Sequence, residues 1–114
     1  MMIRRKGEGV RYVPPGHDEE VSAEKLFNPG TGCDRADAHV TTFAPGASMQ
    51  EEVHPHSDHV FYLLSGRLEV RSGGEVQVLA AGDAVHIPAG EPHRVSNPGP
   101  DAGVFFAVTV PPTR

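Results

Sequence analysis

The chain has little of several things. Cys33 is its one cysteine, tryptophan is absent, and no apolar run approaches the roughly 20 residues of a membrane-spanning helix. A single thiol excludes an internal disulfide framework and a cysteine-based zinc site, and it fits a reducing compartment. The basic start, MMIRRKGEGV, lacks the apolar core of a signal peptide. These absences predict a cytoplasmic protein that does not interact with membranes.

Basic residues are also few. Ten Lys and Arg stand against fifteen Asp and Glu, which gives a formal charge of −5. They are scattered apart from the cluster Arg4, Arg5 and Lys6, so we expect no nucleic-acid surface. A chain of 114 residues predicts one domain, which buries about 65–70% of its unfolded surface.

Glycine (13 residues) and proline (11 residues) divide the chain into short runs of alternating apolar residues. The runs predict strands over residues 10–13, 36–43, 59–64, 67–71, 75–79, 84–87 and 103–110. Residues 22–27 fit either a short helix or a strand. Ser72-Gly73-Gly74 predicts a hairpin turn, and residues 97–100 a loop. Many closely spaced short strands favour an all-β sandwich or closed barrel.

The segment Gly82–Asn97, GDAVHIPAGEPHRVSN, is the most informative part of the chain. Apolar residues alternate over 84–87, as one face of a strand requires. Pro88 removes a ladder donor and marks the end of that strand, and Gly90 permits a turn conformation closed to other residues. The segment therefore predicts a strand, a sharp turn, and His93 just beyond it.

A second segment rich in metal-binding side chains, Gly46–Gly66, lies upstream. It contains His54, His56 and His59 with Glu51, Glu52 and Asp58. Neutral imidazole is the commonest protein ligand for metals, and imidazole with carboxylate suits Mn, Fe, Ni, Cu or Zn. Three histidines within six residues, followed by an apolar strand, favour a metal site over a solvated turn.

The two segments resemble the two conserved motifs of the cupin family. This resemblance covers roughly residues 40–110 and implies an all-β jelly-roll β-barrel, also called a double-stranded β-helix. It implies a cupin barrel over 36–114 and an N-terminal extension over 1–35, whose strand packs on the barrel or on a partner copy. Small single-domain cupins are commonly dimers, so the resemblance also implies a homodimer. It makes His93 a metal ligand.

In the first motif the chain departs from the family pattern. Counting forward from Gly46 puts Glu52 in the slot of the first family histidine and His54 in that of the second. Counting back from Gly66 puts His59 in the slot where the family usually has glutamate. In this register every spacing fits, and the implied metal ligands are Glu52, His54, His59 and His93.

A rival register pairs His54 with His56 and makes His56 the alternative fourth ligand. It leaves one residue too few before His59. We favour Glu52, because strand register is costly to shift and Pro55 suggests that regular pairing ends before His56.

Strand alternation also predicts which way the remaining histidines and the apolar residues face. His39 shares a face with Thr41, which fits either a contact in the pocket or a buried histidine with a purely structural role. His86 is out of phase with its neighbours and is expected to face away from the pocket. His17 is interpreted as a loop residue. The apolar pocket walls are predicted to be Phe43, Phe61, Leu63, Val85, Ile87 and Phe106.

Two classes of function follow. The first is a metal-dependent enzyme, dioxygenase-like or isomerase-like, that binds a small organic substrate through its enol, diol or carbonyl oxygens. In this class Glu52 or His56 is the candidate catalytic base. The second is a non-catalytic binding or sensing module that holds a small molecule beside a metal. We favour the enzyme, because an open histidine-rich site in a pocket is typical of catalysis.

Overall fold

Alternation of apolar and polar residues produces a fold whose regular secondary structure is almost entirely β-strand. The computed structural model describes residues 1–113, with one short 3-10 helix, η1, at Pro29–Thr31. The strands are β1 (Val10–Tyr12), β2 (Val21–Phe27), β3 (Asp37–Phe43), β4 (Asp58–Ser65), β5 (Arg67–Ser72), β6 (Glu75–Ala80), β7 (Ala84–Ile87), β8 (His93–Ser96) and β9 (Gly103–Val110). Within residues 1–113 no helix has the length and apolar character to cross a membrane.

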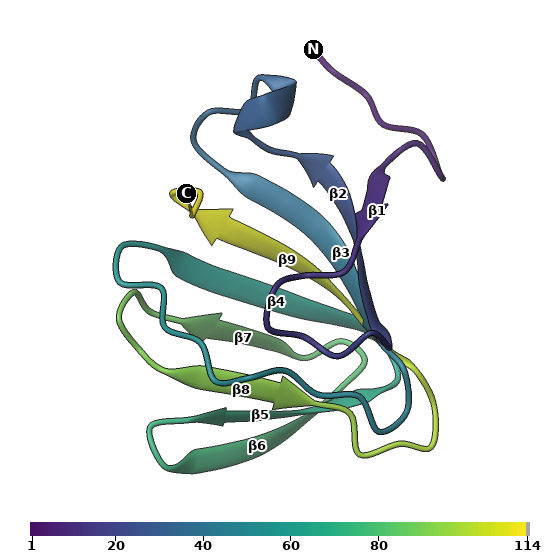
Figure 1. Cartoon of the computed structure of the whole chain (residues 1–114), viewed down its shortest axis with the longest axis vertical. Coiled ribbons are helices and arrows are strands. Elements are labelled where there is room, and N and C mark those ends of the chain that lie inside the picture. Colours follow the sequence, from purple (N-terminus) through teal and green to yellow (C-terminus); the bar gives the residue numbers. More distant parts are fainter. Residues whose placement is uncertain (114) are drawn as a thin grey trace.

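The strands form two antiparallel sheets that face each other (Figure 1). The larger sheet has the order β1-β2-β3-β9-β4-β7, and the smaller has β6-β5-β8. The segment before β4 runs along β8 and joins it through bridges at Ser48↔Ser96 and Glu52↔His93. This arrangement is the jelly-roll β-barrel that the family resemblance implies, and the all-β prediction is confirmed.

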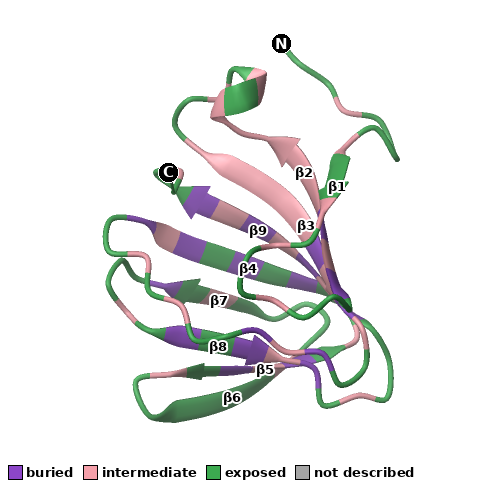
Figure 2. Cartoon of the chain, viewed as in Figure 1, coloured by how far each residue is buried: buried purple, intermediate pink, exposed green. Residues whose placement is uncertain are grey.

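Inward-facing side chains of both sheets make the core. Figure 2 shows buried and more exposed residues alternating along β4 and β9. The largest fully buried side chains, each at 2% relative exposure or less, are those of Phe43, Leu63, Ile87, Val21 and Val95. Burying residues of this size contributes about 1.5–3 kcal/mol each. The core fills one end of the barrel and leaves the other end open for a cavity.

Three local features differ from the sequence expectations or resolve them. Residues 22–27, ambiguous between helix and strand, lie in the strand β2. Strand β8 was not predicted: His93 is its first residue rather than a loop residue just beyond a turn. Residues 1–35 supply β1 and β2, which continue the large sheet beside β3.

Candidate metal centre and its cavity

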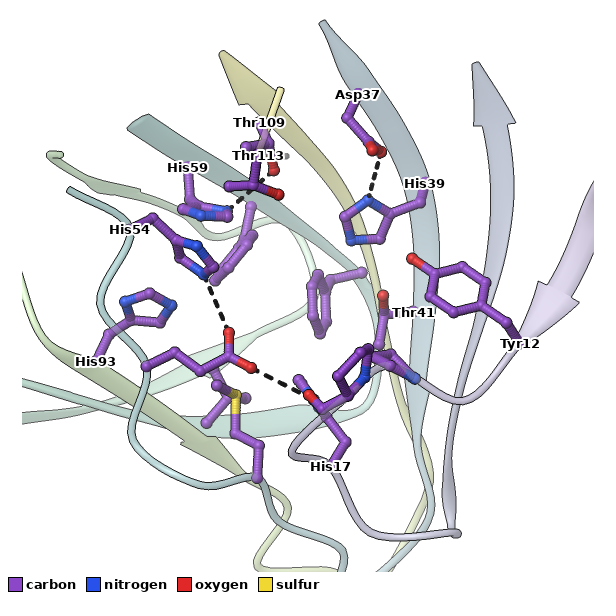
Figure 3. Close-up of a pocket in the computed structure, with 17 residues that line it drawn as sticks. Tyr12, His17, Asp37, His39, Thr41, His54, His59, His93, Thr109 and Thr113 are labelled. Atoms are coloured by element: carbon purple, nitrogen blue, oxygen red, sulfur yellow. Dashed lines mark hydrogen bonds and ion pairs between the residues drawn. The ribbon is translucent and has the colours of Figure 1, made fainter. Parts of the chain in front are cut away.

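A cavity of about 270 Å³ opens at the unfilled end of the barrel. Figure 3 shows its side chains converging from both sheets and from the N-terminal segment. It is lined by Tyr12, Pro14, Pro15, His17, Asp37, His39, Thr41, Met49, Glu52, His54, His59, Phe61, His93, Val95, Phe105, Thr109 and Thr113. We call it the triad cavity, after the histidine triad described next.

The histidine triad consists of His54, His59 and His93, one from each of three neighbouring segments. His59 lies on β4, His93 begins β8, and His54 follows the segment that pairs with β8. Two backbone contacts fix these segments. Glu52 and His93 exchange N–H to carbonyl hydrogen bonds, both 2.9 Å long, and the Gly90 N–H donates to the His54 carbonyl at 2.9 Å.

The three imidazoles are close enough to share one ion. One ring nitrogen from each lies within 4.8 Å of the others, and among the described residues this is the one group of potential ligands with such spacing. Nε2 of His59 is buried and has no hydrogen-bond partner. A buried polar atom without a partner is costly, so this nitrogen is suited to a ligand that the protein itself does not supply.

Neighbouring groups orient two of the rings. Nδ1 of His59 lies 3.1 Å from Oγ1 of Thr109, and Nδ1 of His93 lies 3.2 Å from the carbonyl oxygen of Glu91. A carbonyl accepts only, so His93 donates from Nδ1 and keeps the lone pair of Nε2 for the cavity. Such outer hydrogen bonds commonly fix the tautomer of a metal-binding histidine.

Burial keeps two rings of the triad, those of His59 and His93, in the neutral form. The pKa of His59 is lowered from 6.5 to about 4, mainly by burial and in addition by the nearby His54 and His93. Burial also lowers the pKa of His93, although its hydrogen bond to the Glu91 backbone opposes the shift. A metal ligand must be unprotonated, so these rings are ready to coordinate a cation at neutral pH.

The structure places Glu52 and His56, the rival fourth ligands, differently. Glu52 lines the triad cavity, and its Oε2 lies 3.0 Å from Nε2 of His54. His56 is exposed in the turn after Pro55 and is outside the cavity lining. Glu52 falls outside the tight spacing of the triad, so the carboxylate either completes the donor set or orients His54.

This donor set fits a divalent transition metal. Three imidazoles, one with an unpartnered buried nitrogen, and an adjacent carboxylate are the ligand types of Mn, Fe, Ni, Cu and Zn sites. They occupy one wall of a cavity with open space beside them. The three histidines could therefore hold a metal ion beside open space that admits a small molecule.

The N-terminal segment closes one side of the cavity. It is fixed by a hydrogen bond from the Gln50 N–H to the Gly16 carbonyl at 2.8 Å and by the bridge His17↔Met49. Nδ1 of His17 consequently lies 3.7 Å from Oε1 of Glu52. Sequence reasoning placed His17 correctly in a loop but missed its position in the cavity, since no local pattern shows that this loop folds back.

Polar side chains of β1 and β3 form the wall opposite the triad. Asp37, His39 and Thr41 alternate inward along β3, and Nδ1 of His39 lies 3.4 Å from Oδ1 of Asp37. Tyr12 reaches the same wall from β1. Burial raises the pKa of the Tyr12 hydroxyl, and the charge of Asp37 raises it further, so this phenol stays protonated. Of these residues, sequence reasoning singled out only His39 for a contact with substrate.

Of the predicted apolar walls, only Phe61 lines the triad cavity. Phe43 and Leu63 face inward but lie in the solid part of the core, at 0% and 1% exposure. Phe106 is on the outer face of β9, because inward positions of that strand are odd-numbered, and Phe105 takes the cavity position. The remaining two, Val85 and Ile87, line a separate cavity between β6 and β7.

Alternation could have found some of the residues that were missed. Thr109 shares its face of β9 with Phe105, just as Asp37 shares the face of His39. Met49 and Val95 depend on the pairing between the segment before β4 and β8, which local sequence does not show. As expected, His86 points away from the triad cavity; it is exposed, with Nε2 2.9 Å from Oδ2 of Asp58.

Comparison with known proteins places the chain among relatives. It is 35% identical over 88 residues to the tetracenomycin polyketide synthase protein TcmJ of Streptomyces glaucescens, and the match covers 76% of this chain and 59% of TcmJ. The polyketide synthase CurC of Streptomyces cyaneus is 30% identical, with 85% of this chain and 64% of CurC covered. The chain thus spans less than two thirds of the length of both proteins.

Solved structures and a family model agree with this placement. The polyketide cyclase RemF of Streptomyces resistomycificus superimposes with a TM-score of 0.84 at 26% identity, covering all of this chain and 84% of RemF. A Thermotoga maritima protein described as a predicted oxalate decarboxylase shares the fold with a TM-score of 0.85 at 24% identity, covering 97% of this chain and 100% of that protein. Residues 39–109 match the model of the cupin domain. The chain therefore belongs to the cupin family.

Proposed function

We propose that the protein is a metal-dependent enzyme that moves protons on a small, enolisable substrate, in an isomerase-like or cyclisation reaction. The observation that carries this proposal is the histidine triad, which lines a cavity of about 270 Å³. Within the triad, Nε2 of His59 is buried and has no hydrogen-bond partner. In this proposal His54, His59 and His93 hold the metal, with Glu52 as fourth ligand. When bound, the metal supplies Lewis-acid polarisation of carbonyl or enol oxygens.

The relatives support this class of substrate. TcmJ and CurC are named as polyketide synthase proteins, and RemF as a polyketide cyclase. Polyketide chains carry many carbonyl groups, whose neighbouring C–H bonds become acidic when the carbonyl is polarised. A donor set of imidazoles and carboxylate beside open space suits such oxygens.

The chain's own residues supply binding and exclusion of water. Phe61, Phe105 and Val95 give the cavity an apolar floor, and the segment with His17 covers one side. An apolar cavity with a few placed polar groups is typical of a site for a small organic molecule. Removing water from it strengthens each electrostatic contact with the substrate.

Metal binding tests the first half of the proposal. EDTA-treated protein is titrated calorimetrically with Zn²⁺, Mn²⁺, Fe²⁺, Ni²⁺ and Cu²⁺, with H93Q compared against H86Q. We expect about one ion per chain in the wild type, a large loss of affinity in H93Q and none in H86Q, whose imidazole is outside the triad cavity. Equal metal affinities in H93Q and H86Q would refute the proposed metal site.

Turnover tests the second half. The metal-loaded protein is offered β-diketones, α-keto acids, catechols and flavonols, with oxygen uptake recorded alongside product analysis. Isomerised or cyclised product without oxygen consumption supports the proposal. Oxygen uptake would indicate the dioxygenase-like reaction that the family also contains, and tight binding of unaltered ligands with every metal would favour a binding module.

The setting of this activity is part of the proposal. The single cysteine fits the cytoplasm, and the acidic charge fits a small-molecule ligand better than nucleic acid.

A homodimer is supported by Val60, Tyr62 and Leu64, which expose an apolar stripe on the outer face of β4 at 45–50% relative exposure. Sedimentation equilibrium at micromolar concentration tests the dimer.

A further inference from the structure

The triad cavity has a second chemically active wall, formed by β3 across the sheet from the triad. Strand register puts Asp37 beside Thr109 of β9, and Thr109 beside His59 of β4. Asp37 and His59 are thus two strands apart, which separates their backbones by about 10 Å. In the next row His39 is beside Ala107, which is beside Phe61. Residues of both walls line the triad cavity, which lies between them.

Asp37 fixes the tautomer of His39. An ionised carboxylate only accepts hydrogen bonds, so the ring nitrogen 3.4 Å away, Nδ1, carries the proton and donates. Nε2 is left with its lone pair on the other side of the ring. Figure 3 shows this ring at the edge of the cavity, with Asp37 behind it and the triad on the opposite side. An imidazole held by a carboxylate in this way is suited to accept a proton.

The groups around His39 come from its own strand and from β1, β2, β4 and β9. Asp37 lies on its own strand, with Oδ1 of its carboxylate 3.4 Å from Nδ1 of the ring. The paired position on β2 is Lys25, whose Nζ lies 4.9 Å from the centre of the Tyr12 ring. Tyr12 is protonated and neutral, β9 contributes Ala107 and the Thr109 hydroxyl, and β4 contributes the neutral His59. Asp37 is therefore the only carboxylate among these neighbours of His39.

We propose that His39, positioned by Asp37, is the catalytic base that removes a proton from the substrate carbon next to the carbonyl group facing the triad. This inference rests on the proposed function and deepens it by naming the proton acceptor. It also defines the substrate class: molecules with a carbonyl or enol oxygen at one end and an acidic C–H within reach of the opposite wall. Of the two candidate bases from the sequence, Glu52 is assigned to the metal side, and His56 is exposed outside the cavity lining.

The proton balance needs no oxidant or co-reactant. The C–H bond breaks, Nε2 of His39 forms an N–H bond, and the electron pair remains on the substrate as an enolate. His39 then returns the proton to the enolate oxygen, which yields the enol, or to another carbon, which yields an isomer. The Tyr12 hydroxyl is a second donor on this wall that can hydrogen-bond to a substrate oxygen.

Phenylpyruvate is a suitable probe, because its keto form has a C–H next to a carbonyl and its enol absorbs in the ultraviolet. Its keto–enol conversion and its uptake of deuterium from D₂O are measured with zinc-loaded wild type, H39Q, D37N and H86Q. The last variant is a matched control, since His86 is also paired with an aspartate but lies outside the triad cavity. We expect H39Q to lose about a hundredfold or more in kcat, D37N to lose less with its KM unchanged, and H86Q to match wild type.

Two readouts do not depend on activity. Zinc content shows that each variant retains the triad, and NMR of the imidazole rings shows which histidines contact the probe. We expect the His39 ring signals, identified by their absence in H39Q, to shift on saturation with phenylpyruvate, whereas those of His86 stay in place. Unshifted His39 signals with bound phenylpyruvate would overturn the inference.

The failures of the two proposals are distinguishable. If zinc-loaded wild type and H39Q exchange deuterium at the same accelerated rate, the metal-dependent enzyme stands and the role of His39 is refuted. If the wild type fails to bind phenylpyruvate or to accelerate its conversion, both the substrate class and the role of His39 are refuted.

Discussion

Glu52 and His93 hold each other through two backbone hydrogen bonds, each 2.9 Å long. This bridge joins the two motif segments that the sequence keeps far apart. It puts the carboxylate of Glu52 beside His54 and brings His93 toward His59, with ring centres of the two histidines 5.4 Å apart. The unpredicted strand β8 is thus the element that assembles the donor set.

The choice between Glu52 and His56 is testable by metal affinity. We expect E52Q to raise the Kd for Zn²⁺ by about 10–100-fold, because loss of the charge removes either a ligand or the group that orients His54. H56Q serves as the control and should bind like wild type, since His56 is exposed in the turn after Pro55. Loss of zinc in H56Q alone would restore the rival register.

Thr109 offers a test of how the buried ring of His59 is oriented. Its hydroxyl lies 3.1 Å from Nδ1 of His59 in the core. T109V removes this partner and should weaken zinc binding by about tenfold or more, as measured by competition with a chelator. T109S keeps the hydroxyl and should retain nearly full affinity. Equal zinc affinity in the two variants would show that Thr109 does not position the ring.

The neutral state of His59 predicts acid sensitivity in the metal-free protein. Its pKa is about 4 in the fold and 6.5 when unfolded, so between these values the unfolded chain binds more protons. The stabilisation is complete above pH 6.5 and is lost as the pH falls toward 4. The shift corresponds to about 3 kcal/mol for this group.

Urea unfolding of EDTA-treated protein at pH 7.5, 6 and 5 measures this dependence. The H59Q variant removes the titrating group and should show a shallower fall in free energy of unfolding over the same range. Parallel pH profiles for wild type and H59Q would mean that other groups cause the acid sensitivity.

Much of the fold could be predicted because strand signals are local. Alternation set the bounds of β7 and β9 as the structure has them, and glycine marked the hairpin between β5 and β6. Strand β8 escaped because HRVS is short and follows directly on a turn. Its pairing partners, β5 and the segment around Glu52, lie far away in the sequence.

The candidate site was predictable to the same degree. His54, His59 and His93 were found from motif spacing, and the structure brings them together. The residues of the cavity walls were harder to predict, because an inward-facing position on a strand does not decide whether its side chain lines open space or packs in the solid core. Leu63 and Phe61 both face inward on β4, yet only Phe61 reaches the cavity. That difference depends on where the barrel is filled.

The glycine that ends the first motif is required by sterics. Gly66 has a φ of +75°, and an added Cβ would contact the Ala102 carbonyl and come within 3.0 Å of the Gly103 Cα. Gly46 has a similar φ of +81° with nothing within 4 Å, so it is a matched control. Left-handed backbone alone costs alanine about 1–2 kcal/mol. We expect G46A to lose about that much free energy of unfolding in urea. G66A should lose clearly more, because the backbone at Ala102 and Gly103 must move to make room for the added Cβ. Equal losses would show that the backbone at Ala102 and Gly103 moves aside without a cost in free energy, and that the left-handed conformation alone explains the glycine at position 66.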